Sequence, residues 1–429
     1  MFHNIILEFA ERLENLKYLD DYFMTSNEQK KLSFMTTIAE GFPAISLFYS
    51  QLNLINSNQK HKKLLHLYLE KSIAGFQNKT LNTNISIFTG ITGLCFVVWI
   101  SSENGKQYQG LLEKLDSILF HFLDSSLKSF EEKIFFIPSD YDVIQGLSGV
   151  IRYLILRKNN KIHEKYLKSC LQIMIKISSN IQYENEMVPG WFFTKEEGIS
   201  YLESFKGTFN FGLSHGVSGI LATLSISKLN GIEIDEMENS IYRIKNWILK
   251  WTLKDKFGEY WPNKISLEEQ ISNKFISNQN IHCRQAWCYG VPGVSRSLYL
   301  AGKALSDIEL QERAAKAFLE IETRPEEEWR CFSPTFCHVF AGLLQISKRF
   351  YVDTKNENFL IFEKKLENRI LDFYFQSSPL LFKEREKKED CLQDLKNIGI
   401  IEGAVGTLLS LLHPDQLDNC VWDYPFLIS

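Results

Sequence analysis

The chain has 429 residues, of which 45% are hydrophobic, and its formal net charge at pH 7 is only -4. This composition supports a large buried core, and no basic tail or arm indicates a nucleic acid as partner. Glu8 and Glu11 stand where an export signal would have a basic start and an apolar stretch. Because no export signal is expected, the eight cysteines at irregular spacings are typical of reduced thiols, and we expect a soluble cytoplasmic protein.

A Gly-x-x-Gly step, or a close variant of it, recurs along the chain, and each copy is followed by an apolar run. The first residues of the steps are Gly41, Gly90, Gly146, Gly216, Gly290, Val339 and Gly403. The last of the four residues in each step is glycine, except in the first step, where it is Ala44. Because the apolar runs contain no helix breakers, they predict helices that are buried on most sides.

Between the steps lie more amphipathic stretches, for example 309–320 and 358–375, which predict a second helix in each repeat. One repeat is then a helix pair of about 50 residues, and stacked pairs bury each other's faces. The first and last repeats are as apolar as the middle ones, which favours closure of the row into a ring. We therefore expect an all-α fold, an α/α toroid, in a single domain over residues 1–429.

Three further segments bear on this interpretation. The uncharged stretch 80–102 is interrupted by polar residues and two glycines, so it predicts a buried helix hairpin and not a membrane span. The segments 182–211 and 257–283 are rich in glycine, proline, asparagine and aromatic residues. They predict irregular structure or short β excursions within the two longest intervals between steps.

Residues just before the steps converge at one rim if all the buried helices begin there. Cys288 and Cys337 both lie two residues before the first residue of their steps, and His215, Tyr289 and His338 lie one residue before theirs. Two thiolates and one imidazole, from Cys288, Cys337 and His338, form a three-ligand zinc set with one open coordination position. The alternative is that the cysteines are buried thiols, since cysteine is often simply a small core residue.

Four other residues are candidates for the chemistry beside such a metal. His215 suits general acid–base catalysis. Its alternative roles are a fourth metal ligand and a hydrogen-bonded histidine at the rim. Asp142 is a candidate to orient His215 or Arg284, although a lone aspartate is more often a helix cap. Arg284 and Tyr289 flank Cys288 and offer donors to a developing oxyanion, while Arg284 equally fits a structural ion pair.

Cys283 has a different offset from Gly290 and is a weaker ligand candidate, and His282 is interpreted as a structural or solvent-facing residue. Glu40 and Glu402 precede their steps directly, but no acidic partner for glycoside chemistry is evident for either.

The chain contains four motifs, at residues 141–149 (YDVIQGLSG), 212–219 (GLSHGVSG), 283–290 (CRQAWCYG) and 336–338 (FCH). Together they resemble the motifs of the lanthipeptide cyclases, the lanthionine synthetase C-like family, and the stand-alone cyclases of the nisin and subtilin type are nearest. The resemblance covers essentially the whole chain. It implies an α/α toroid of seven inner and seven outer helices with a small β-rich insertion, for which we choose residues 182–211.

The resemblance also implies roles for individual residues. The zinc ligands of the family correspond to Cys288, Cys337 and His338, for one Zn²⁺ per chain. The catalytic histidine, aspartate, arginine and tyrosine of the family correspond to His215, Asp142, Arg284 and Tyr289. One departure is Val339, where the family usually has glycine after the Cys-His pair.

The function implied by the resemblance is a zinc-dependent cyclase of lantibiotic biosynthesis, which adds cysteine thiols of a precursor peptide to dehydroalanine or dehydrobutyrine. The implied partners are the dehydrated precursor with its leader and core, a dehydratase and an ABC-type exporter. Attachment to the inner face of the membrane would run through these partners, without direct membrane insertion. Two alternatives are a zinc-containing scaffold that binds a peptide or glutathione without cyclase activity, and prenyltransferase-like thiol alkylation, whose zinc sets include a carboxylate.

Overall fold

The computed structural model describes residues 2–15, 28–55, 57–77, 84–103, 105–194, 207–276, 285–337, 339–385, 392–412 and 421–429. It divides into two compact units, each made mostly of helices. The first unit comprises Met1–Leu119 and Cys331–Asp423, and the second comprises Phe120–Arg330 and Tyr424–Ser429. The expectation of a single domain over residues 1–429 stays a prediction. Within the described ranges, none of the helices combines the length and the apolar character needed to span a membrane.

In both units, the helix that begins directly after the first residue of a glycine step is buried along most of its length, and we call these helices the buried helices. They are α4 (Phe42–Ile55), α6 (Ile91–Ser101), α16 (Phe340–Thr354) and α18 (Ala404–Ser410) in the first unit, and α9 (Leu147–Leu156), α11 (Val217–Leu229) and α14 (Val291–Ala304) in the second. Every residue of α11 from 217 to 227 is buried. The prediction of helices buried on most sides is thus confirmed.

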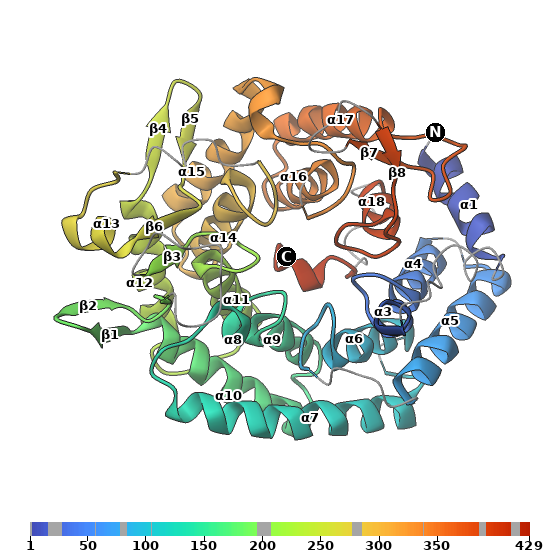
Figure 1. The fold of residues 1–429 in the computed structure, drawn as a ribbon, viewed down its shortest axis with the longest axis horizontal. Helices are drawn as coiled ribbons and strands as arrows, with labels where there is room; N and C mark the ends of the chain where they lie inside the picture. Colours follow the sequence, from blue (N-terminus) through green and yellow to red (C-terminus); the bar gives the residue numbers. More distant parts are fainter. Residues whose placement is uncertain are drawn as a thin grey trace. The chain divides into compact units, whose positions relative to one another are not determined.

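Within the first unit, the buried helices pack in the order α16, α18, α4 and α6, so that the last repeat of the chain lies against the first (Figure 1). A main-chain hydrogen bond joins the loops that precede α18 and α4, since the Ile400 amide donates to the Ile38 carbonyl at 3.1 Å. In the second unit, α11 packs between α9 and α14. The apolar character of the terminal repeats is explained in the first unit by their contact with each other.

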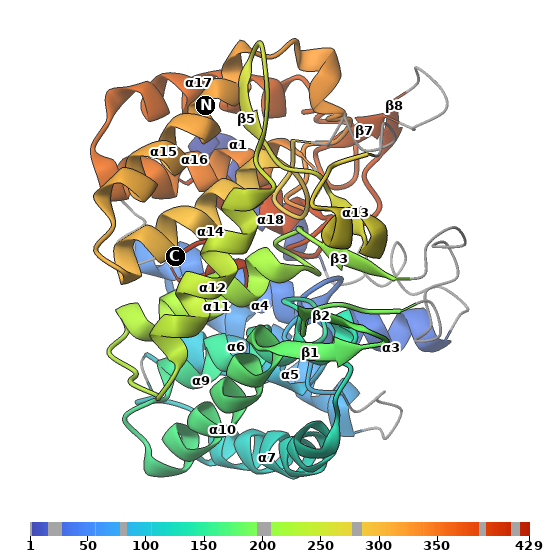
Figure 2. The same ribbon diagram turned by 90° about the vertical axis from the view of Figure 1, so that its left-hand side faces the viewer.

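A second set of helices flanks the buried ones. It consists of α1 (Phe2–Leu13), α3 (Glu28–Thr36), α5 (Gln59–Gln77), α7 (Gln109–Glu132), α10 (Lys161–Ser178), α12 (Met237–Lys250), α15 (Ile308–Leu319) and α17 (Glu357–Leu371). In α12, which is amphipathic, the side chains of Ile241, Ile244 and Ile248 are buried at helical spacing. In the second unit, α10 packs on α9 and α12 packs on α11 (Figure 2).

Shorter helices connect these elements. They are α8 (Pro138–Tyr141) and α13 (Leu267–Ser272), together with the 3₁₀ turns η3 (Glu320–Thr323), η4 (Glu326–Trp329) and η6 (Tyr424–Phe426). The helix α8 ends at Asp142, whose side chain is discussed below.

The strands form small antiparallel pairs. The pairs are β1 (Asn180–Tyr183) with β2 (Glu186–Pro189), β3 (Thr208–Asn210) with β6 (Lys264–Ser266), β4 (Leu253–Asp255) with β5 (Gly258–Tyr260), and β7 (Lys383–Arg385) with β8 (Leu392–Asp394). Strands thus occur in both of the longest intervals between glycine steps, 149–216 and 219–290, and the β3–β6 pair joins these two intervals. Assignment of a β-rich insertion to residues 182–211 alone stays a prediction.

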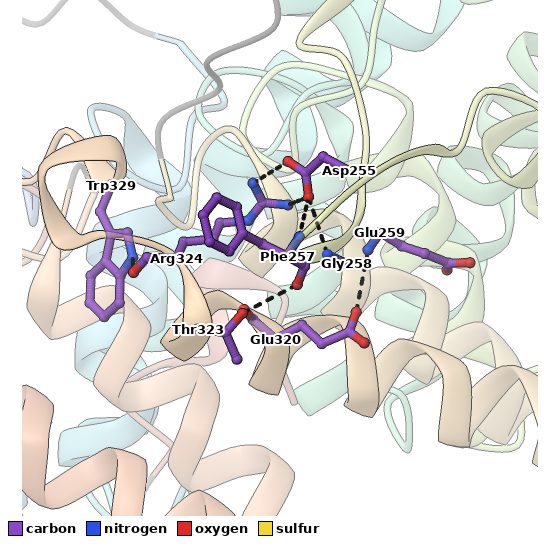
Figure 3. A network of polar contacts seen from close by, with 8 residues as sticks. All are labelled: Asp255, Phe257, Gly258, Glu259, Glu320, Thr323, Arg324 and Trp329. Carbon is purple, nitrogen blue, oxygen red and sulfur yellow. Dashed lines mark hydrogen bonds and ion pairs between the residues drawn. The ribbon is translucent and has the colours of Figure 1, made fainter.

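The β4–β5 hairpin is held against the end of α15 by a network of polar contacts (Figure 3). The Arg324 guanidinium donates to both carboxylate oxygens of Asp255, at 2.6 and 2.9 Å. The Asp255 carboxylate also accepts from the amides of Phe257 and Gly258. Burial alone would raise the pKa of Asp255, but Arg324 and the two amides outweigh it and hold that pKa below its usual range.

Replacing Asp255 by Asn is expected to lower the free energy of unfolding by about 1–2 kcal/mol at pH 7. Because the folded-state pKa is lowered, the stabilisation is present above the ordinary aspartate pKa of about 4 and is lost as pH falls through the folded value. Denaturant unfolding at pH 7 and at pH 3 measures the effect, with exposed Asp235→Asn as the matched control. An equal destabilisation by Asp255→Asn at both pH values would contradict this account.

Candidate active site

The loops that lead into the buried helices share one local geometry. A Cβ atom on the second glycine of a step would lie against the carbonyl oxygen six residues earlier. The distance would be 2.2 Å between Gly93 and Ile87, 2.5 Å between Gly219 and Leu213, 2.3 Å between Gly293 and Trp287, and 2.0 Å between Gly406 and Ile400. No side chain fits at such a distance from a backbone atom, so glycine is needed in these four repeats, where the loop packs on its own helix.

Main-chain contacts join neighbouring loops at the positions that carry the cysteines. In the second unit, the Cys288 carbonyl accepts long contacts from the amide and hydroxyl of Ser214, at 3.5 and 3.4 Å. In the first unit, the Cys337 amide donates to the Ile401 carbonyl at 2.9 Å. Cys288, Ser214, Cys337 and Ile401 all lie two residues before the first residue of their steps. Within each unit, the repeat therefore brings equivalent positions side by side.

Asp142 and His215 form a hydrogen-bonded pair in the second unit. Asp142 Oδ2 lies 2.5 Å from His215 Nδ1, while Oδ1 accepts from the amides of Gln145 and Gly146 at 2.6 and 2.9 Å. The Asp142 side chain is 2% exposed and that of His215 is 40% exposed. An ionised carboxylate only accepts hydrogen bonds, so the proton of neutral His215 is assigned to Nδ1. The basic nitrogen of His215 is then Nε2.

Tyr289 is held by a residue that the sequence analysis did not single out. Asn210, at the end of β3, donates from Nδ2 to the Tyr289 hydroxyl oxygen at 3.0 Å, and its Oδ1 accepts from the Gly212 amide at 2.8 Å. A Cβ on Gly212 would lie 2.7 Å from the Tyr289 ring. The hydrogen bond from Asn210 therefore fixes the position of the Tyr289 hydroxyl oxygen.

Asn210 belongs to a sequence pattern that recurs in three repeats. Asn84, Asn210 and Asn397 each lie six residues before the first glycine of their step, and each side-chain oxygen accepts the amide two residues further on. This turn opens the loop in three repeats. Arg284 has the same offset from Gly290 but lies outside the described residues, as do His282 and Cys283.

The two candidate ligand cysteines are buried, with 3% exposure at Cys288 and 7% at Cys337. Each lies two residues before the residue that begins a helix, Gly290 for α14 and Val339 for α16. Gly290 has φ 104°, a value that favours glycine, whereas Val339 has φ -165°, which is extended backbone open to any residue. Valine is therefore accommodated at 339 although the family usually has glycine there.

The third candidate ligand, His338, lies outside the described residues. Among the side chains that are described, no group of three or more His, Cys, Asp and Glu is placed to hold a metal ion. Of the predicted site residues, the second unit brings Asp142 and His215 into contact and places Cys288 and Tyr289 in the adjacent loop. Cys337 belongs to the first unit.

Comparison with known proteins gives consistent matches. The family model described as lanthionine synthetase C-like protein matches residues 34–427. The nisin biosynthesis protein NisC of Lactococcus lactis subsp. lactis is 26% identical over 379 residues, which are 87% of this chain and 84% of that protein. A solved structure of nisin cyclase has a TM-score of 0.79 at 22% identity, and the match covers 100% of this chain and 96% of that one. This likeness confirms the expected fold class, an α/α toroid.

The family match includes the loops that carry Asp142, His215, Cys288 and Cys337. It spans nearly all of the two units and agrees with the resemblance found in the motifs. The chain therefore belongs to the lanthionine synthetase C-like family, and its enzyme class is that of a lanthionine synthetase, a lanthipeptide cyclase.

Proposed function

We propose that this enzyme joins cysteine thiols of a dehydrated precursor peptide to dehydroalanine and dehydrobutyrine by Michael-type addition, forming lanthionine and methyllanthionine rings of a lantibiotic. The observation that carries the proposal is the buried Asp142 carboxylate bonded to the half-exposed His215, beside the loop of Cys288. A histidine oriented in this way can move a proton, which addition of a thiol to an alkene requires.

One Zn²⁺ per chain is proposed, with Cys288, Cys337 and His338 as its ligands. The described residues fit such an ion in three respects. Both cysteines are buried, both occupy the same position relative to a helix start, and neither helix has a side-chain cap. Helix N-termini favour the thiolate form of a nearby cysteine, which is the form that binds a metal. When bound, zinc would favour the thiolate form of a substrate cysteine.

The protein groups account for the movement of the proton. His215 Nε2 accepts the proton of the substrate thiol, and Asp142 stabilises the imidazolium that results. The sulfur then bonds to the β-carbon of the dehydro residue, while the π electrons of the double bond move toward Cα and the carbonyl oxygen. The imidazolium returns the proton to Cα, so that the thiol and the alkene are converted into a thioether with no atom lost.

The developing enolate oxygen needs a hydrogen-bond donor. Tyr289 is the proposed donor among the described residues, because it directly follows Cys288 and Asn210 holds its hydroxyl oxygen in place. Arg284, four residues before Cys288, is proposed as a second donor on its place in the sequence and on the resemblance.

The wider setting is proposed from the family. The substrate would carry a leader and a core, and a dehydratase and an ABC-type exporter would be partners. We propose that the enzyme works in the cytoplasm, peripherally at the inner membrane face through those partners.

A thiol-counting experiment tests the proposed reaction. Cyclisation leaves the mass of the peptide unchanged but removes thiols that an alkylating agent can modify. A dehydrated precursor is therefore incubated with the enzyme, alkylated and weighed by mass spectrometry. We expect one alkyl group fewer for each ring formed, and unchanged alkylation relative to the enzyme-free control would refute the proposal.

A further inference from the structure

The last residues of the second unit, Tyr424–Ser429, pass through its interior, and we call them the C-terminal segment. Phe426, Leu427 and Ile428 are at most 1% exposed. Leu427 has φ 54°, a left-handed conformation that is unfavourable for a leucine and persists only where its surroundings enforce it. The segment is therefore held in a defined conformation.

Three side chains hold the carbonyl groups of this segment. Trp287 Nε1 donates to the Phe426 carbonyl at 2.9 Å, and Arg296 Nε donates to the Ile428 carbonyl at 2.7 Å. Arg152 Nη2 donates to the Ser429 oxygen at 3.1 Å. Both guanidinium groups belong to residues that are at most 3% exposed, and a buried cation is tolerated only where it is well paired.

Aromatic contacts add to these hydrogen bonds. The Arg152 guanidinium lies 3.5 Å from the centre of the Tyr424 ring. The rings of Trp287 and Phe426 meet edge to face at 5.1 Å and 90°. Such arrangements are favoured by the charge distribution of the rings and restrict their rotation.

These hydrogen bonds and ring contacts connect the C-terminal segment to the loop that carries Cys288. Trp287 directly precedes Cys288, and its carbonyl packs against Gly293 of α14. Arg296 lies in the second turn of α14, and Arg152 lies in α9. The C-terminal segment thus joins α9, α14 and the intervening Cys288 loop through one residue from each.

We infer that the C-terminal segment is a positioning element for Cys288: by fixing the Trp287 side chain, it sets the orientation of the loop and the affinity of the thiol for a metal. This inference rests on the proposed role of Cys288 as a zinc ligand. Partners that orient a metal ligand typically change metal affinity by about 10–100-fold when they are removed.

The deciding variant is Trp287→Phe, which keeps an aromatic ring but loses the hydrogen bond to Phe426. Its matched control is Trp247→Phe on α12, which loses a comparable indole hydrogen bond, to Gln270 at 3.0 Å. Zinc affinity is measured by competition with a chromophoric chelator, and Tm is measured for each metal-free protein. We expect Trp287→Phe to bind zinc about 10–100-fold more weakly than the wild-type protein does. Trp247→Phe is expected to bind zinc with wild-type affinity, although the Tm values of the two metal-free variants are similar.

The possible failures are distinguishable. Wild-type affinity in Trp287→Phe overturns the inference and leaves the proposed function intact, whereas absence of zinc binding by the wild-type protein overturns the proposed zinc site itself. Equal weakening in both tryptophan variants would mean a general effect of stability and would also overturn the inference. If Trp287→Phe does not fold, Phe426→Leu, which removes the edge-to-face contact from the other side, decides in the same assay.

Discussion

Cys337→Ala and Cys288→Ala are each expected to lose stoichiometric zinc and thioether formation together. Changes that merely disturb a ligand's surroundings cost about 10–100-fold in affinity, so removal of a ligand is expected to cost more than about 100-fold. Elemental analysis of the purified protein and the alkylation assay measure the two losses on one sample.

The matched control is Cys170→Ala on α10. This thiol is buried, and burial raises its pKa to about 12, which disfavours the thiolate that a metal requires. Cys170→Ala is expected to keep both zinc and activity, at some cost in stability from the lost side chain. Zinc and cyclisation at wild-type levels in Cys337→Ala would contradict the assigned ligand set.

His215→Ala is expected to retain zinc but to lower the rate of ring formation by about 10²–10⁴-fold, the usual contribution of general acid–base catalysis. Asp142→Asn is expected to retain zinc and to lose rate as well, because an amide nitrogen facing His215 Nδ1 favours the wrong tautomer. Quenched time courses with the dehydrated precursor and elemental analysis separate rate from metal content.

An exposed histidine outside this pair gives the control. His66 on α5 has a side chain 55% exposed, and His66→Ala is expected to leave rate and metal content unchanged. Loss of zinc in His215→Ala would instead assign His215 as a fourth ligand. An unchanged rate would assign it as a rim histidine without a catalytic role.

The repeat could be predicted from the sequence because its determinants are local. A glycine step followed by an apolar run specifies a loop and a buried helix, and both are present at Gly216 and α11. The pairing of His215 with Asp142 was one of several options, since a lone aspartate is commonly a cap. Asp142 in fact does both, because one carboxylate oxygen accepts loop amides and the other faces the imidazole.

Other features depend on contacts between distant segments and could not be predicted. The pairing of Thr208–Asn210 with Lys264–Ser266 joins two intervals, and nothing local in three-residue strands specifies such a partner. The burial of Tyr424–Ser429 depends on Arg152 and Arg296, which lie on helices more than a hundred residues away. The role of Asn210 could not be predicted for a different reason. Its offset from the glycine step is regular, but the residue that it binds, Tyr289, lies in another repeat.

The central claim is that thiol addition by this enzyme depends on zinc, and a chelation experiment tests it most directly. The protein is treated with a strong chelator, dialysed and assayed by alkylation and mass spectrometry with and without added Zn²⁺. We predict that the chelated enzyme leaves the precursor thiols alkylatable and that one equivalent of Zn²⁺ restores their loss. Ring formation by the demetallated enzyme at the wild-type rate would contradict the account.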